Sequence, residues 1–284
     1  MASVLVLIAA PGSRAITSRV VDAVRDLGGG APVWLAEAEA CEFEHVPEIG
    51  KMLRGLPIDV NSVETNNRRK KLLIADMDST MIHQECIDEL GVMAGVGDQI
   101  KNITARAMQG ELDFEGALKE RVSLLRGLDQ SVIAQLLRER ITFMEGGKTL
   151  LATMKSNGAY AALVSGGFTA FTSHIAAELG FDENRANRLL IENGKLTGEV
   201  AMPILGQRAK VESLKRICRD RDISQDEVVA VGDGANDIPR VLEAGMGVAL
   251  HAKPKVQEAA QIVINHGDLT ALLYLQGYKK SEFK

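Results

Sequence analysis

The feature that most constrains this chain is a short apolar run that ends in two aspartates. Residues 72–75 (Leu-Leu-Ile-Ala) are followed at once by Asp76 and then by Asp78. A short, continuous apolar run bounded by polar residues is typical of a strand buried in a parallel sheet. Ligands of open α/β sheets bind beyond the carboxyl ends of the strands. The sequence therefore predicts that both aspartates lie at the ligand-binding edge of a sheet.

A second acidic group follows another apolar run far along the chain. Residues 228–231 (Val-Val-Ala-Val) are rich in β-branched side chains and predict a strand, after which come Asp233 and Asp237. Carboxylates gathered at one sheet edge repel one another unless a cation separates them. Because all the ligands are oxygen atoms, Mg²⁺ suits such a site better than Zn²⁺.

Two weaker motifs lie between these acidic groups and the end of the chain. Ser165, Gly166 and Gly167 follow the apolar residues 161–164, and a Ser-Gly-Gly turn that leads into a helix offers a hydroxyl and free N–H groups to an anion. Lys210 stands near the start of an expected helix over residues 209–218. Taken singly, an ordinary strand-to-helix turn and a solvated lysine are the better explanations.

Together and in this order, the motifs resemble the haloacid dehalogenase-like phosphatase superfamily, over about residues 70–284. The similarity is closer to the phosphoserine phosphatases within it. The segments that carry this closer resemblance are 76–80 with Glu85, 114–122, 232–239, 244–249 and 251–254. Arg240 departs from the pattern, since relatives usually carry an apolar residue there, and we expect this to affect packing or exposure rather than chemistry.

The resemblance and the alternating strand and helix patterns imply an α/β fold. We expect a HAD-like Rossmannoid parallel sheet with helices on both faces, an inserted helical cap and a small α+β N-terminal domain. The expected boundaries are 1–66 for the N-terminal domain, 67–82 with 146–284 for the core, and 83–145 for the cap. Asn193-Gly194 predicts a hairpin turn, and Thr80 is expected to cap a helix that follows it.

For catalysis, the resemblance implies that Asp76 is the nucleophile and forms an aspartyl-phosphate. It implies that Asp78 is the general acid and base, and that Ser165 and Lys210 hold phosphate oxygens. Mg²⁺ would be bound by Asp76, Asp233 and the backbone carbonyl of Asp78, with Asp237 supporting that shell.

The resemblance also assigns the substrate contacts. Glu85 would pair with the substrate ammonium, Arg121 with its carboxylate, and Phe114 would pack over its carbon stem. Gly166 and Asn236 are further expected substrate contacts. Without the resemblance, a surface charge, a solvated arginine and a core phenylalanine are the favoured explanations of the first three.

The implied function is Mg²⁺-dependent hydrolysis of O-phospho-L-serine to L-serine and phosphate, the last step of serine biosynthesis. One alternative keeps the chemistry but changes the substrate or acceptor, such as phosphohomoserine or phosphoryl transfer to homoserine. A different class is a phospho-accepting signalling module, which also uses an acidic pocket, Mg²⁺ and a lysine. The inserted cap and the position of Asp78 argue against that class.

Composition limits the partners. Hydrophobic residues make up 46% and charged residues 25%, which is typical of a globular protein, and the net charge of −5 argues against a nucleic-acid binder. The apolar residues 4–10 are too few to span a membrane, and cysteines without a paired spacing favour a cytoplasmic location. For the N-terminal region, binding of a regulatory amino acid, homodimer formation and a purely structural role all stay open.

Overall fold

The computed structural model describes residues 3–44, 49–109 and 111–284. Internal contacts divide the chain into two units, residues 1–74, 144–161 and 214–284 on the one hand, and residues 75–143 and 162–213 on the other. The units are described in turn below.

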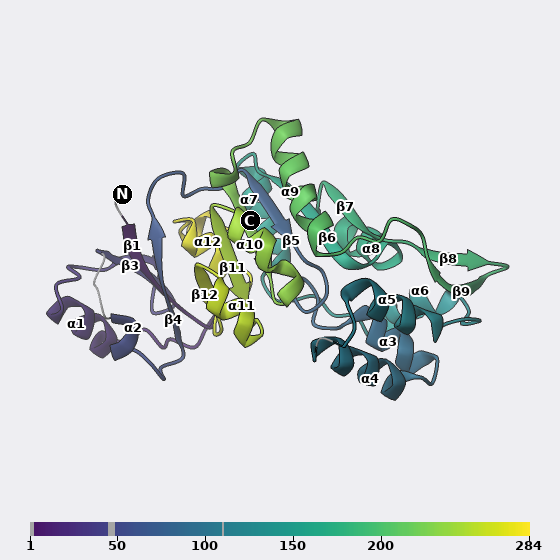
Figure 1. Ribbon diagram of the computed structural model, residues 1–284. Coiled ribbons are helices and arrows are strands. Elements are labelled where there is room, and N and C mark those ends of the chain that lie inside the picture. Colours follow the sequence, from purple (N-terminus) through teal and green to yellow (C-terminus); the bar gives the residue numbers. More distant parts are fainter. Residues whose placement is uncertain (1–2, 45–48, 110) are drawn as a thin grey trace. The chain divides into compact units, whose positions relative to one another are not determined.

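A six-stranded sheet runs through the chain in the order β12-β11-β10-β5-β6-β7 (Figure 1). Its strands are β5 (Leu72–Ala75), β6 (Tyr160–Phe168), β7 (Glu183–Asn187), β10 (Val228–Gly232), β11 (Met246–Leu250) and β12 (Ile262–Ile264). Every residue of β5, β10 and β11 is buried, which explains why these strands are continuous apolar runs. The pairs β10–β11, β11–β12 and β6–β7 are parallel, as expected for an α/β fold.

The first unit begins with an antiparallel sheet in the order β2-β3-β1-β4. Its strands are β1 (Ser3–Ala9), β2 (Val33–Ala36), β3 (Ala40–Glu44) and β4 (Ile58–Glu64), and its helices are α1 (Ser18–Asp26) and α2 (Ile49–Met52). Helix α1 buries Val20 and Val24 against this sheet's apolar core. The expectation that residues 61–69 form a linker is wrong for residues 61–64, because these belong to β4.

Strand β4 is polar in sequence because its side chains bind distant backbone. The Asp59 carboxylate accepts hydrogen bonds from the N–H groups of residues 265–267 at 2.8 to 3.0 Å. The Asn61 amide both donates to the Val263 carbonyl and accepts from the Val263 N–H, each at 3.0 Å. These contacts join β4 to β12 and the turn after it within the first unit.

The first unit also contains four helices from the rest of its chain segments. They are α7 (Gly147–Ser156), α10 (Ile238–Glu243), α11 (Pro254–Ala259) and α12 (Ala271–Leu275). Across the described part of the chain, no helix combines the length and apolar character needed to cross a membrane.

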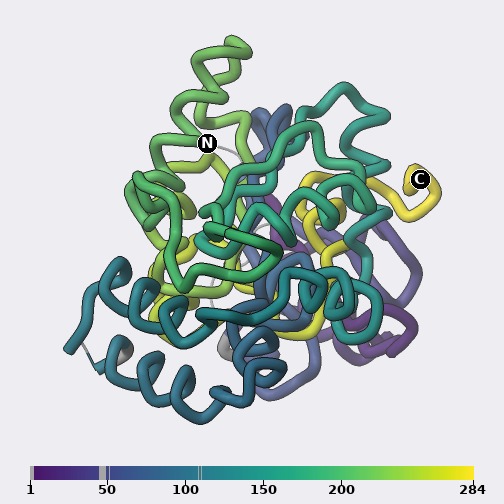
Figure 2. Tube along the Cα trace, turned by 90° about the vertical axis from the view of Figure 1, so that its right-hand side faces the viewer, coloured from purple at the N-terminus to yellow at the C-terminus, as the bar shows by residue number. Residues whose placement is uncertain are grey.

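The second unit carries a group of helices inserted after β5. These are α3 (Cys86–Met93), α4 (Gly97–Met108), α5 (Phe114–Ser123) and α6 (Ser131–Glu139), and Figure 2 shows them as one blue-to-teal group. The two chain segments that enter and leave the group are paired, since the His83 N–H donates to the Thr142 carbonyl and the Gln84 side chain bonds Thr142. Helices α8 (Thr169–Leu179) and the first part of α9 (Gln207–Arg221) complete the unit.

A two-stranded hairpin, β8 (Leu189–Glu192) and β9 (Lys195–Val200), extends from the second unit. The turn at Asn193-Gly194 is confirmed, because Glu192 pairs with Lys195 and both turn residues have positive φ angles. The hairpin is bonded to the loop between α5 and α6. Backbone hydrogen bonds of 2.8 to 2.9 Å join residues 127–130 to residues 194–196.

Candidate active site

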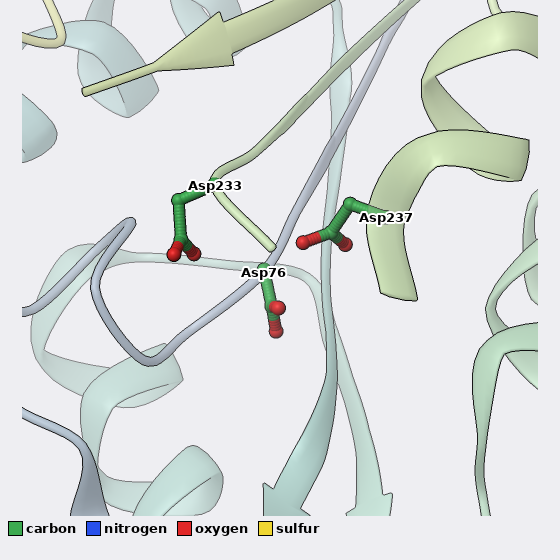
Figure 3. Close-up of side chains that lie close together, drawn as sticks. All are labelled: Asp76, Asp233 and Asp237. Carbon is green, nitrogen blue, oxygen red and sulfur yellow. The ribbon is translucent and has the colours of Figure 1, made fainter. Parts of the chain in front are cut away.

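Three buried carboxylates lie close together at strand ends: Asp76, Asp233 and Asp237 (Figure 3). One oxygen from each lies within 4.8 Å of the others. Asp76 directly follows β5 and Asp233 directly follows β10, while Asp237 closes the short 3₁₀ turn Ala235–Asp237. A donor set made only of carboxylate oxygens fits a hard divalent cation. The described residues thus offer a buried site that could hold a metal ion.

A lysine from a distant helix reaches Asp76. The Lys210 Nζ lies 2.5 Å from Asp76 Oδ2, and the Lys210 side chain is fully buried. The other oxygen, Asp76 Oδ1, accepts the N–H of Met77 at 2.8 Å. Both oxygens of Asp76 are therefore held in place, and a cation stands beside the carboxylate.

Asp78 is set apart from Asp76 by its surroundings. Its Oδ1 accepts the N–H of Cys86, the first residue of α3, at 3.0 Å. Burial, together with the negative charges of Glu85 and Asp76, raises the pKa of Asp78 well above its usual range. Asp78 therefore tends to keep a proton under conditions in which an ordinary aspartate is ionised. Its side chain does not belong to the three-carboxylate cluster found among the described residues.

The Ser165-Gly166-Gly167 segment differs from its prediction. It does not form a turn before a helix but continues β6, which ends at Phe168, and α8 begins at Thr169. The pairing with β7 shifts register between Val164 and Phe168, so the segment is an irregular stretch of strand. Ser165 is buried, and its Oγ accepts the Gly167 N–H at 2.9 Å. Gly167 has no room for a side chain, since an added Cβ would lie 2.7 Å from Asp78 Oδ2.

The expected substrate contacts in the helical insert are Glu85, Phe114 and Arg121. The exposed Glu85 accepts the Ser79 hydroxyl at 2.9 Å. Phe114 begins α5, and its ring lies against Gly206, where an added Cβ would come within 3.2 Å of Phe114 Cδ1. An open depression of about 450 Å³ lies here, with Phe114 and Gly206 in its lining.

Arg121 lies on α5 and is half-buried. Its Nε donates to the Ala117 carbonyl at 3.2 Å, and its Nη1 is 3.4 Å from Thr104 Oγ1. Burial lowers the pKa of Arg121, and the acidic groups that act in the opposite direction are Asp88, Glu85 and Asp78. The guanidinium therefore sits in acidic surroundings and has local partners.

Three other expected residues are placed as follows. Gly166 lies in β6 beside Ser165, and Asn236 lies in the 3₁₀ turn one residue before Asp237. The expectation for Thr80 is wrong, because the next helix begins at Cys86 with Glu85 as its N-cap residue. Thr80 instead lies in the tight turn after β5, where its N–H donates to the Met77 carbonyl.

Arg240 is a residue whose contact the sequence did not indicate. Its side chain is fully buried, and its Nη2 donates to Asp237 Oδ1 at 2.6 Å and to the Val231 carbonyl at 3.1 Å. The departure at Arg240 therefore touches the carboxylate cluster itself, rather than packing alone. The spacing of three residues between Asp237 and Arg240 is the sequence signal that would have suggested this pair.

Comparison with known proteins agrees with this arrangement. The family model for haloacid dehalogenase-like hydrolases matches residues 73–240. The chain belongs to this family. The predicted family and HAD-like α/β fold are thereby confirmed.

Individual relatives extend the similarity. The phosphoserine phosphatase of Haemophilus influenzae is 42% identical over 227 residues, which are 79% of this chain and 72% of that protein. A crystal structure of a probable phosphoserine phosphatase from Vibrio cholerae, in unliganded form, is 32% identical with a TM-score of 0.83, covering 99% of this chain and 88% of that one. A substrate-bound phosphoserine phosphatase complex is 42% identical with a TM-score of 0.68, covering 72% of this chain and 97% of that one.

Proposed function

We propose that this chain hydrolyses O-phospho-L-serine to L-serine and phosphate through an aspartyl-phosphate. The observation that carries the proposal is the state of the two aspartates after β5. Asp76 is held ionised beside Lys210, whereas the pKa of Asp78 is raised. A nucleophile and a proton donor two residues apart are what a phosphomonoesterase needs. The activity named for the relatives supports phosphoserine as the substrate.

We propose Mg²⁺ as the metal ion. Asp76 and Asp233 would hold it, with the Asp78 backbone carbonyl, and Asp237 would support them, since these groups supply only oxygen donors. When bound, the ion would offset the negative charge of the phosphate dianion.

In the proposed first step, an Asp76 oxygen attacks phosphorus in line with the serine oxygen, and the bond between phosphorus and that oxygen breaks. Asp78 gives its proton to the departing alkoxide. In the second step a water molecule attacks the aspartyl-phosphate, Asp78 takes the proton of that water, and the bond to Asp76 breaks to release phosphate. Lys210 and the Ser165 hydroxyl would hold phosphate oxygens, where they stabilise the charge that develops in both steps.

The helical insert would select the substrate. In this proposal Arg121 binds the serine carboxylate, Glu85 binds its ammonium, and Phe114 packs over the carbon stem. Gly166 and Asn236 would complete the contacts to the substrate. The acidic surroundings of Arg121 support this role, because the same region has to bind an ammonium group.

The organisation around the site is part of the same proposal. The N-terminal domain (1–66), the core (67–82 and 146–284) and the cap (83–145) would form separate functional parts. A cytoplasmic location and a homodimer are also proposed.

The deciding experiment is a phosphate-release assay on a panel of phosphomonoesters. We expect release from O-phospho-L-serine with free serine as the second product, dependent on Mg²⁺ and abolished by a chelator. Phosphohomoserine and p-nitrophenyl phosphate serve as alternative substrates, and homoserine as an alternative acceptor. Turnover of another ester without turnover of phosphoserine would overturn the substrate, and a long-lived phosphorylated protein without turnover would indicate a signalling module.

A further inference from the structure

A buried amide joins two segments of the second unit. Asn187, the last residue of β7, is 3% exposed. Its Nδ2 donates to the Gly166 carbonyl at 2.8 Å and to the Leu205 carbonyl at 3.2 Å, and its Oδ1 accepts the Leu205 N–H at 2.6 Å. Both N–H groups of the amide are thus in use. The side chain ties the irregular end of β6 to the segment that leads into α9.

The bond to Gly166 fixes more than one atom, because that carbonyl belongs to the peptide joining Gly166 to Gly167. In a planar trans peptide the C=O and the N–H point in opposite directions. The N–H at the other edge of this peptide is that of Gly167, which donates to Ser165 Oγ at 2.9 Å. An amide that holds the carbonyl edge therefore aims the N–H edge at the serine hydroxyl.

This peptide needs an anchor because it lies between two glycines, which adopt many backbone conformations at little cost. If the peptide turned over, the Gly166 carbonyl would replace the Gly167 N–H beside Ser165. The hydroxyl would then donate its hydrogen to that carbonyl. With the N–H in place, one lone pair of Ser165 Oγ is occupied and its hydrogen stays available to an acceptor.

We infer that Asn187 is a positioning residue, which holds the Gly166–Gly167 peptide so that the Ser165 hydroxyl is presented to a phosphate oxygen. This inference rests on the proposed function, in which Ser165 binds the phosphate. Its competitor is a purely structural role, in which Asn187 only fastens Leu205 and the start of α9. The test has to separate these two roles.

Asn187→Asp is the informative substitution, because it keeps the shape and an acceptor for the Leu205 N–H but places an oxygen opposite the Gly166 carbonyl. We expect kcat/KM for phosphoserine to fall about tenfold or more. Asn184→Asp is the matched control on the same strand. The Asn184 Oδ1 accepts the hydroxyls of Thr172 and Ser173, which a carboxylate can also accept, so this variant stays within about twofold of the wild type.

A double-mutant cycle with Ser165→Ala decides between the roles. If Asn187 acts through the Ser165 hydroxyl, Asn187→Asp lowers kcat/KM by less than about twofold once that hydroxyl is absent. An equal loss in both backgrounds would show a structural role and overturn the inference. Asn187→Leu breaks the same bond without a buried charge and replaces Asn187→Asp if thermal unfolding shows that the latter does not fold.

The cycle is measured with p-nitrophenyl phosphate as well as with phosphoserine. The aromatic ester needs the phosphate contacts but none of the contacts to serine. If the wild type cleaves only the aromatic ester, the proposed substrate fails, and the cycle on that ester still tests Asn187. If the factors agree in both backgrounds on every ester cleaved, the inference about Asn187 fails by itself.

Discussion

Replacing Arg240 by methionine should destabilise this protein strongly. Arg240 and Asp237 are both fully buried, and the Nη2–Oδ1 distance is 2.6 Å. Asp237 has little room to move away, since an added Cβ at Gly232 would lie 2.4 Å from Asp237 Cγ. Arg240→Met fills a similar volume but leaves a buried carboxylate near Asp76 and Asp233 without its cation. Breaking a buried pair from one side costs about 3–5 kcal/mol, which is the loss expected here.

The measurement is urea unfolding followed by circular dichroism, in the presence of a chelator. Arg208→Met is the matched control, because the Arg208–Glu212 pair has a similar 2.9 Å distance but side chains that are 93% and 56% exposed. Loss of that pair should cost no more than about 1 kcal/mol. A free energy of unfolding that falls equally in both variants would refute the reasoning from burial.

Addition of Mg²⁺ extends the same experiment. A divalent cation bound by the carboxylate cluster supplies part of the positive charge that Arg240→Met removes. We therefore expect Mg²⁺ to raise the melting temperature of Arg240→Met more than that of the wild type. An equal rise in both would mean that the Arg240 guanidinium and the ion do not compensate the same negative charge.

Three further outcomes are expected. Asp76→Asn should keep the fold, as judged by circular dichroism, and lose turnover; substantial residual activity would exclude Asp76 as nucleophile. Arg121→Ala should raise KM about tenfold or more for phosphoserine but little for p-nitrophenyl phosphate, and equal changes would make Arg121 structural. Although burial raises the pKa of Glu39, hydrogen bonds from Lys280 and Tyr274 hold it below the ordinary 4.5. The stability that Glu39 contributes is therefore complete above pH 4.5 and is lost as the pH falls through the lower folded value, so Glu39→Gln should flatten the decline of melting temperature between about pH 5 and about pH 3.

How much of the fold could be predicted depended on burial. Strands β5, β10 and β11 were predictable because every residue in them is buried, which leaves a continuous apolar signal. Strand β7 reads Glu-Asn-Arg-Ala-Asn and lies at an edge of the sheet, so it has no such signal. Strand β12 has only three residues, which is too short for a pattern to appear.

The candidate site divides in the same way. Asp76, Asp78 and Asp233 follow predictable strands within a residue or two, so local sequence was enough to place them at one sheet edge. Whether Ser165 lies in a turn or in a strand was not decided locally. The two glycines after it permit either conformation, and the pairing with β7 selects the irregular strand.

The polar residues that sequence patterns missed share one physical property: their partners are main-chain groups of distant segments. Asp59 binds N–H groups more than 200 positions away, Asn187 binds the carbonyl of Gly166, and Arg240 donates to the carbonyl of Val231. Every residue type supplies a main-chain N–H or C=O except that proline lacks the N–H, so the partner leaves no mark in the sequence. Such a side chain becomes informative only once the fold shows that it is buried. At that point the cost of burying an unpaired polar group requires a partner, and the partner reveals which segment is being held.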